Sequence, residues 1–332
     1  MHSRKPWRLA GALAAALVLA TACGSSGSDS ESGGSAGTRV FAADNGKVTI
    51  PADPQRVVAT GYAVPVLIEA EAKLVGISTW KRGLPMMSAE ERATYDGLTK
   101  IAGEAAAETN YEAIAKTRPD LIVVGVPMPV LGDLDMKRLQ SIAPVAVIGP
   151  TLPNSWRELS SRQADAAGRA GRLAQSKAAY EKKAGELKAT YAGALAGLEF
   201  GHLGAYGDRS AGTFLREFAD SWGTNIPQDV GVTYYGQVKK KGGGSNDVSE
   251  TPSLEELPES FGEADAITYT LQPDGKPAPE VQYVLDSKLW KNLPAVKAGK
   301  VFPLRYTEAA TYGSAMRTLD EIDTVFAPLL KK

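Results

Sequence analysis

The sequence of 332 residues is poor in the side chains that bind metal ions or form disulfide bonds. It has two histidines and one cysteine, so no disulfide can form within the chain. A receptor for free zinc or manganese would need several histidines. Here His2 lies in the N-terminal leader, and His202 begins a predicted strand, where a structural role is expected. The sequence therefore predicts neither a protein-bound metal ion nor a cofactor.

The sequence also lacks the patterns that mark common enzymes and nucleic-acid-binding proteins. Its formal net charge is −1, without the basic excess that binds nucleic acid. No Gly-x-Ser-x-Gly nucleophile elbow joins a predicted strand to a helix, and there is no plausible Ser-His-Asp set. Residues 242–245 are glycine-rich and follow three lysines, which resembles a mobile loop and not a phosphate-binding loop. We expect a chain that is not an enzyme and binds no nucleic acid.

The N-terminus has the pattern of a secretory signal. Three basic residues precede an apolar run, residues 9–22, that ends at Cys23. Because a spanning helix needs about 20 apolar residues, this run predicts a signal peptide of residues 1–22. Residues 19–23 resemble the lipobox of bacterial lipoproteins, with Ala20 in place of the usual leucine. The resemblance implies that Cys23 is lipidated and anchors the mature chain to the outer face of the cell membrane.

A tether and a large body follow the cysteine. From Gly24 to Gly37 the chain consists of Gly, Ser, Ala and acidic residues, a composition that behaves as a flexible coil. We assign the lipidated cysteine and this tether to residues 23–38. The ordered body begins near Arg39 and is too long for one comfortable core, which predicts two lobes.

The body has the alternating pattern of parallel α/β units. Short β-rich runs are separated by helical patterns in the expected N-terminal lobe, residues 39–153. Its predicted strands are residues 57–59, 74–77, 121–124 and 145–148. In open α/β sheets ligands bind beyond the carboxyl ends of the strands. The loops that follow these strands are therefore expected to line one rim of a ligand cleft.

A long helical segment separates the two predicted lobes. No proline occurs between Pro153 and Pro227, and the early part of this stretch has apolar residues at helical spacing. We predict a linking helix over residues 154–196, capped by Asn154 or Ser155. At about 1.5 Å per residue it would span roughly 55 Å, enough to join two lobes rigidly.

The expected C-terminal lobe, residues 197–332, repeats the α/β pattern. Its predicted strands are residues 202–205, 266–269 and 301–304, and a final helix is expected from about residue 313 to 330. The predicted fold class is therefore α/β, with two Rossmann-like lobes, one long bridging helix and a ligand cleft between the lobes.

Four segments in this order resemble motifs of the iron-siderophore, cobalamin and heme class of ABC-importer substrate-binding proteins. They are Gly46-Lys47-Val48-Thr49-Ile50-Pro51 with Pro54-Gln55-Arg56-Val57-Val58; Asn110-Tyr111-Glu112-Ala113-Ile114 with Arg118-Pro119-Asp120-Leu121-Ile122; Ser253-Leu254-Glu255-Glu256-Leu257; and Ala295-Val296-Lys297-Ala298-Gly299-Lys300-Val301. The resemblance covers the body from about residue 40 to the end. It implies a monomeric extracellular lipoprotein that captures a ferric siderophore and delivers it to the permease dimer of an ABC importer. Cobalamin and heme remain alternative ligands.

The resemblance also implies how such a protein meets its permease. In this family one acidic residue on each lobe pairs with arginines of the permease, and the matching positions here are Glu112 and Glu255. Two separated charges fix orientation and speed encounter. A glutamate at position 112 is also favoured in the first turn of a helix by the helix dipole, without any docking role. The position of Glu255 is harder to align with the family motif, because Glu250 and Glu256 lie close by in the sequence.

The ligand side is expected on the rim loops. A ferric siderophore already saturates its iron, so the protein must supply aromatic walls and hydrogen-bond donors instead of metal ligands. The candidates are Tyr62, Trp80, Tyr206, Arg209, Arg305, Tyr306 and Tyr312. We expect Trp80 to face Arg305 and Tyr306 across the cleft, whereas Tyr312 is as well suited to the start of the final helix. Trp222 and Trp290 are expected in core helices. The few candidate arginines favour a hydroxamate complex over a highly anionic catecholate.

Overall fold

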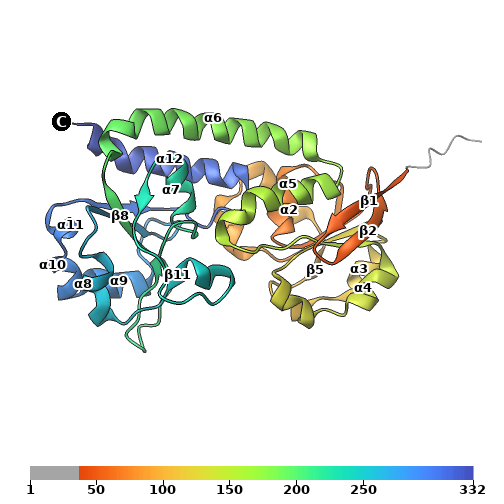
Figure 1. The fold of residues 1–332 in the computed structure, drawn as a ribbon. Coiled ribbons are helices and arrows are strands. Elements are labelled where there is room, and N and C mark those ends of the chain that lie inside the picture. The colour runs from red at the N-terminus through yellow and green to blue at the C-terminus, as the bar shows by residue number, and fades with distance from the viewer. Residues whose placement is uncertain (1–36, 332) are drawn as a thin grey trace, which may run out of the picture. The chain divides into compact units, whose positions relative to one another are not determined.

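A computed structural model describes residues 37–331 of the chain. The predicted signal peptide, Cys23 and the tether up to residue 36 lie outside the described residues. The body groups into one compact unit. Within it, two α/β lobes and a long helix are arranged as the sequence predicts, so the fold class is confirmed (Figure 1).

The N-terminal lobe contains a five-stranded parallel sheet in the order β5-β4-β3-β6-β7. Its strands are β3 (Val57–Gly61), β4 (Leu74–Ser78), β5 (Lys100–Ala102), β6 (Leu121–Gly125) and β7 (Val145–Val147). All five residues of β6 are buried, which explains its continuous apolar sequence. The four predicted strands are confirmed, and β5 was missed because three residues at a sheet edge carry little pattern.

An antiparallel hairpin and four helices complete this lobe. The hairpin is β1 (Thr38–Ala43) with β2 (Gly46–Pro51), and the helices are α1 (Ala63–Glu69), α2 (Ala89–Gly97), α3 (Tyr111–Lys116) and α4 (Met136–Ile142). The amide of Asp44 donates to the carbonyl of Val147, so the hairpin turn is fixed against the edge strand β7.

The C-terminal lobe contains a six-stranded sheet. Its order is β11-β9-β8-β12-β13, with β10 also paired to β8. The strands are β8 (Glu199–Leu203), β9 (Arg216–Glu217), β10 (Thr233–Tyr234), β11 (Ser249–Glu250), β12 (Ala266–Thr270) and β13 (Val301–Leu304). The three predicted strands exist as β8, β12 and β13, although β8 begins three residues earlier than expected. The short β9 and β11 are antiparallel additions that the α/β pattern does not predict.

Six helices surround this sheet. They are α7 (Asn225–Asp229), α8 (Leu257–Phe261), α9 (Pro279–Asp286), α10 (Lys288–Asn292), α11 (Pro294–Lys297) and α12 (Tyr312–Phe326). The predicted final helix is thus confirmed as α12, and its last turn continues as a short 3-10 helix, Ala327–Leu330.

The segment predicted as one linking helix is two helices, α5 (Trp156–Ala166) and α6 (Ala170–Leu195). The break follows from a glycine at the end of α5. Gly168 has φ +68°, and the amide of Arg169 donates to the carbonyl of Ala164, which is the Schellman arrangement that ends helices. The amphipathic pattern runs through the break, so periodicity alone does not reveal it. The long bridging helix is α6, with 26 residues.

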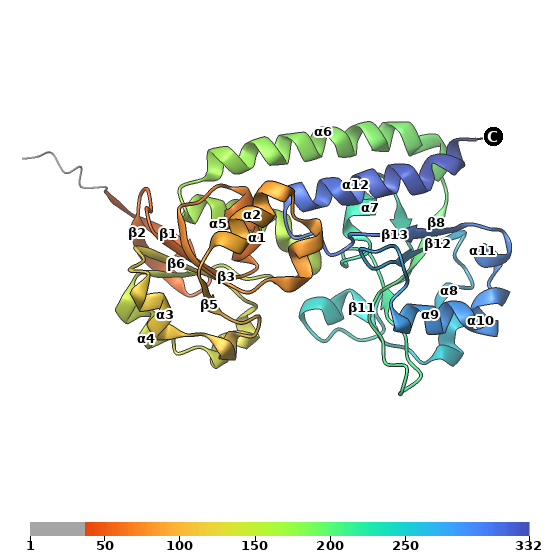
Figure 2. The ribbon, with the colours of Figure 1, turned by 180° about the vertical axis from the view of Figure 1, so that it is seen from behind.

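Helices α6 and α12 lie side by side and join the two lobes on one side of the molecule (Figure 1, Figure 2). Tyr180, Leu187 and Tyr191 of α6 share a buried core with the apolar face of α12. The start of α12 also contacts the N-terminal lobe, because the Arg317 guanidinium donates to the carbonyls of Pro85 and Met87 at 3.1 and 2.9 Å. These contacts hold the lobes on either side of a cleft.

Candidate ligand-binding cleft

Aromatic side chains from both lobes line a cavity between them. Its volume is about 210 Å³, and its lining residues are Tyr62, Trp80, Arg82, Tyr206, Trp222, Ser245 and Glu308. Tyr62 and Trp80 come just after β3 and β4 of the N-terminal lobe, where the sequence places the rim. Tyr206 follows β8 of the other lobe. The expected interlobe cleft is therefore present, with three of the predicted aromatic residues in it.

Two glycines allow the chain to present Tyr62 at the rim. Gly61 has φ +57°, and a β-carbon at this position would lie 2.5 Å from the carbonyl oxygen of Gly125. The amide of Tyr62 donates to that same oxygen at 2.8 Å. Glycine is required because only it tolerates both the left-handed backbone and the close approach of β6. Partial burial raises the pKa of Tyr62, so its phenol stays neutral.

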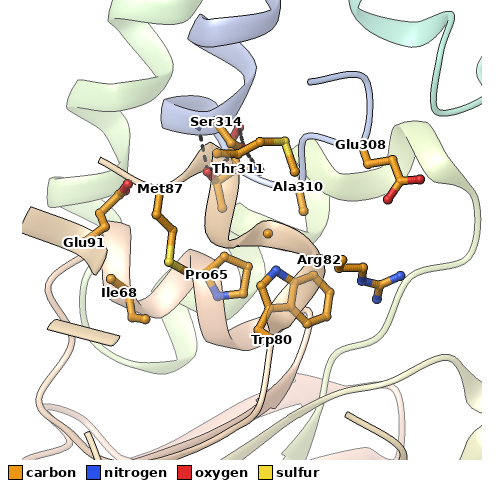
Figure 3. Close-up of a pocket in the computed structure, with 12 residues that line it drawn as sticks. Pro65, Ile68, Trp80, Arg82, Met87, Glu91, Glu308, Ala310, Thr311 and Ser314 are labelled. Carbon is orange, nitrogen blue, oxygen red and sulfur yellow. Dashed lines mark hydrogen bonds between the residues drawn. The ribbon is translucent and has the colours of Figure 1, made fainter. Parts of the chain in front are cut away.

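Arg82 covers the aromatic wall of the N-terminal lobe. Its guanidinium carbon lies 4.1 Å from the ring centroid of Trp80 and 4.6 Å from that of Tyr62. The two rings meet edge to face with centroids 4.9 Å apart, and only 5% of Trp80 is exposed. Arg82 itself is exposed, so it presents a positive charge to the cleft on a hydrophobic support. Figure 3 shows Arg82 and Glu308 on the same side of the Trp80 ring.

The wall of the cleft that the C-terminal lobe forms carries a carboxylate. Glu308, from the turn after β13, lines both the first cavity and an adjoining cavity of about 360 Å³. The second cavity shares Arg82 and Tyr206 with the first and adds Tyr306. The hydroxyl of Tyr206 donates to Glu308. Partial desolvation by the cleft walls, followed by the neighbouring charge of Glu308, raises the pKa of Tyr206, which therefore remains a neutral hydrogen-bond donor.

Three of the candidate residues do not line these two cavities. The Arg305 guanidinium makes two hydrogen bonds, of 2.9 and 2.7 Å, to the carboxylate of Glu321 on α12. This pairing raises the pKa of Arg305 and leaves the ligand side to Arg82, so the expectation that Trp80 faces Arg305 is wrong. Tyr312 is 3% exposed and packs between Trp156 and Tyr180 at the lobe junction. Tyr312 is thus the first residue of the final helix and is buried outside the two cavities.

Arg209 lines a different hollow of the C-terminal lobe. It lies in the turn after β8, beside Ser210, and shares an open hollow with Tyr283 and Asp286 of α9. Asp208 stabilises the turn by accepting hydrogen bonds from the Ser210 amide and hydroxyl. The Gly-Asp turn exposes Arg209 as expected, but away from the aromatic cavity.

Trp222 belongs to the cleft and not to a helical core, so that prediction was wrong. The residue lies in a turn before α7, and its ring stacks on that of Tyr62. The polar and glycine neighbours of Trp222 are a turn signal that outweighs its size. Trp290, by contrast, is confirmed as a core residue, because it is 5% exposed and packs edge to face against Phe261 and Tyr269.

The lysine- and glycine-rich segment also reaches the cleft. Gly243 and Gly244 both have positive φ and lead into a 3-10 helix, Gly244–Asp247. Ser245 of this turn lines the aromatic cavity. A β-carbon on Gly244 would lie 3.9 Å from the carbonyl oxygen of Thr151, so the turn approaches the N-terminal lobe. The lysine- and glycine-rich composition predicts a loop, but the contact of this loop with the cavity depends on the tertiary fold.

A buried polar cluster lies next to Trp222. His202 is fully buried between Thr268 and Thr270, whose hydroxyls are 2.7 and 3.1 Å from its ring nitrogens. Its Nε2 is 3.6 Å from Oε2 of Glu217, which accepts the Gly223 amide at 2.6 Å. Burial lowers the pKa of His202 to about 3 and raises that of Glu217 to about 7. His202 is therefore a neutral structural residue, as expected.

The two candidate docking glutamates occupy matching local positions. Glu112 and Glu255 are each the second residue of a short helix, after the N-caps Asn110 and Ser253. Both are exposed. Glu256 instead accepts a hydrogen bond from the Ser253 amide at 3.1 Å, and of the two adjacent glutamates Glu255 is the more exposed. Glu112 is part of α3, and the 3-10 helix of Glu255, Leu254–Glu256, leads directly into α8. Helices α3 and α8 lie on the side of the molecule away from α6 (Figure 1, Figure 2).

With this geometry established, comparison with known proteins places the chain in a family. The chain belongs to the periplasmic binding protein family Peripla_BP_2, whose pattern matches residues 57–306. It is 26% identical over 303 residues to the iron(3+)-hydroxamate-binding protein YxeB of Bacillus subtilis, covering 89% of this chain and 87% of that protein. It is 29% identical to the iron(3+)-hydroxamate-binding protein FhuD of the same organism, covering 89% of each.

Solved structures have the same fold. The siderophore periplasmic binding protein from the fuscachelin gene cluster of Thermobifida fusca is 30% identical, with a TM-score of 0.67 over 84% of this chain and 98% of that one. Staphylococcus aureus SirA, solved with staphyloferrin B, has a TM-score of 0.68 at 21% identity, over 87% of this chain and 99% of SirA, and supports the fold alone. Among residues 37–331 no helix is long and apolar enough to cross a membrane.

Proposed function

We propose that this chain is the substrate-binding component of an ABC importer and that its ligand is a ferric siderophore, with a hydroxamate complex favoured. The observation that carries the proposal is the interlobe cavity, in which Arg82 lies on the Trp80 and Tyr62 rings and faces Glu308 and Tyr206. The iron(3+)-hydroxamate-binding relatives support the same ligand class. No catalytic role is proposed.

The cleft offers what a preformed iron complex requires. Iron arrives as cargo with its coordination already filled by the siderophore, so the protein needs no iron ligand. The rings of Tyr62 and Trp222 provide apolar surface for the organic shell. The Arg82 guanidinium can donate hydrogen bonds to the iron-bound oxygens, which carry most of the negative charge of the complex.

Anchoring and docking are part of the same proposal. Residues 1–22 would direct secretion, and a lipid on Cys23 would hold the protein at the outer face of the membrane through the tether of residues 23–38. The body would then act as a monomer with an N-terminal lobe (39–153), a linking segment (154–196) and a C-terminal lobe (197–332). Glu112 and Glu255, one on each lobe and both exposed, would pair with basic residues of the permease dimer.

A ligand titration tests this function. Intrinsic fluorescence of the purified protein is followed while a ferric trihydroxamate, a ferric tricatecholate, cobalamin or heme is added. We expect quenching and the tightest binding with the hydroxamate. Selective binding of cobalamin or heme would replace the siderophore by one of those ligands within the same class of importer.

A further inference from the structure

The carboxylate of Glu308 has a central place in the cleft that the proposed function does not explain. It lines the aromatic cavity, the adjoining cavity that contains Tyr306, and a small enclosed hollow beneath Trp80 and Arg82 (Figure 3). A ferric siderophore that contacts both Arg82 and Tyr206 must therefore pass close to Glu308. A fixed negative charge at this point affects every ligand that enters.

Within residues 37–331 the ion pairs do not include Glu308. In this part of the chain, Oε1 of Glu308 accepts a hydrogen bond from the Tyr206 hydroxyl, which leaves Oε2 of Glu308 available. Tyr206 is 60% exposed, so it orients the carboxylate from the solvent side without covering it. Arg82 lines the same cavities but lies over the Trp80 and Tyr62 rings. The cleft thus presents a positive group from the N-terminal lobe and a negative group from the C-terminal lobe.

Other charges near the cleft make its C-terminal side more acidic. Glu280 lines the adjoining cavity together with Glu308. Lys239, the first lysine of the nearby loop, is paired with Glu256 and Glu259 at 3.0 and 3.2 Å. A polyanionic complex in the two cavities would face the carboxylates of Glu280 and Glu308, with Arg82 as the basic residue that lines both cavities.

We propose that Glu308, oriented by Tyr206, selects ferric siderophores that carry a cationic group, such as a protonated amine, at the end facing the C-terminal lobe. Arg82 then contacts the iron-bound oxygens and Glu308 contacts the ammonium. This inference rests on the proposed siderophore function and adds the charge class of the ligand. A partly desolvated carboxylate–ammonium contact stabilises such a complex, whereas a trianionic complex is repelled.

A pair of matched ligands tests the proposal. One is a linear ferric trihydroxamate with a free terminal amine, and the other is the same complex with the amine acetylated. Both share the iron core, so their affinity ratio isolates the cationic group. We expect the purified protein to bind the amine form about tenfold or more tightly than the acetylated form.

Glu308→Gln keeps the shape of the side chain and removes its charge. We expect this variant to lose the preference, so that the ratio of the two Kd values falls to about one, whatever the change does to binding of the shared iron core. The control Glu186→Gln removes an exposed carboxylate of α6 and should keep the preference. Circular dichroism melting checks that each variant is folded. In the unaltered protein, added salt should weaken the amine form more than the acetylated form.

The outcomes separate the two proposals. If the unaltered protein binds both hydroxamate complexes equally tightly, or if Glu308→Gln keeps the preference, charge selection by Glu308 is wrong while siderophore binding stands. If neither complex binds and cobalamin or heme does, the proposed function itself is wrong and the selection falls with it.

Discussion

The ring of Tyr62 in the N-terminal lobe stacks on the ring of Trp222 in the C-terminal lobe, with centroids 6.0 Å apart and planes inclined by 8°. This contact spans the cleft and joins residues 160 positions apart in the sequence. It makes Trp222 the tryptophan that is placed to report on ligand binding, since Trp80 is covered by Arg82 and Trp290 lies in the core.

The first prediction concerns this stack. Trp222→Phe should remove a large part of the fluorescence quenching caused by a ferric hydroxamate, with little loss of affinity. Trp222→Ala should weaken binding by about 1–3 kcal/mol, because an aromatic wall is lost without replacement. Titration of the purified variants measures both effects. Trp290→Phe is the matched control; quenching that disappears with Trp290 instead would place the ligand elsewhere.

The second prediction separates the two arginines. Arg82→Ala should weaken binding of every ferric hydroxamate by about 1.5–3 kcal/mol, because a charge-assisted donor is lost. Arg305→Ala should leave ligand affinity unchanged and lower the free energy of unfolding by about 1–3 kcal/mol, because Glu321 loses its partner while largely buried. Calorimetric titration and urea unfolding distinguish them. The reverse pattern would mean that Arg305 turns toward the ligand.

The third prediction follows from the raised pKa of Glu217 and the lowered pKa of His202. Because the pKa of Glu217 is about 7 in the folded chain, the folded chain keeps a proton that the unfolded chain releases near pH 4.5. The free energy of unfolding therefore falls as the pH rises from about 4.5 to 7. Because the pKa of His202 is about 3 in the folded chain, only the unfolded chain binds a proton there between about pH 3 and 6.5. The free energy of unfolding therefore rises with pH over this range. The two effects oppose each other between pH 4.5 and 6.5, where folded and unfolded chains each hold one proton on this pair.

Glu217→Gln should expose the histidine effect alone. Its melting temperature should rise from pH 4.5 to 6.5 more steeply than that of the unaltered protein, measured by circular dichroism in matched buffers. Asp274→Asn, in an exposed turn, is the control and should follow the unaltered profile. Parallel profiles for Glu217→Gln and the unaltered protein would contradict the assignment of the proton to Glu217.

The fourth prediction addresses the permease. Glu112→Ala and Glu255→Ala should each reduce siderophore uptake by cells, on the order of tenfold, while the purified variants keep their ligand affinity. The effects should be roughly additive because the residues lie on separate lobes. Glu186→Ala on α6, on the other side of the molecule, should transport normally. A loss of ligand affinity would assign the altered glutamate to the cleft.

The fifth prediction concerns Cys23, which lies outside the described residues. Cys23→Ala should release the protein into the medium, folded and able to bind ligand. Fractionation of cells and medium followed by a binding titration measures this. Retention of the variant in the membrane fraction would refute the lipid anchor.

The two lobes and the long helix between them follow from local sequence patterns. The short, β-branched apolar run of β6 favours a strand buried on both faces, and the apolar spacing of Tyr180, Leu187 and Tyr191 predicts that one side of α6 packs against a core. Tyr62 and Trp80 come just after parallel strands, and the carboxyl ends of such strands form one rim. Local pattern therefore predicted both the lobes and part of the cleft.

The set of side chains that meet in the cleft depends instead on contacts between residues far apart in the chain. Arg305 turns to Glu321, sixteen residues away on a helix, and Arg82 takes its place over the aromatic rings. Trp222 faces Tyr62 because its turn is fixed by contacts to Glu217 and Thr224, which sequence periodicity does not encode. Periodicity reports which face of an element is buried, whereas loop side chains are positioned by partners far away in the chain. The fold could therefore be predicted from the sequence, whereas the contacts between side chains in the cleft depend on the tertiary structure.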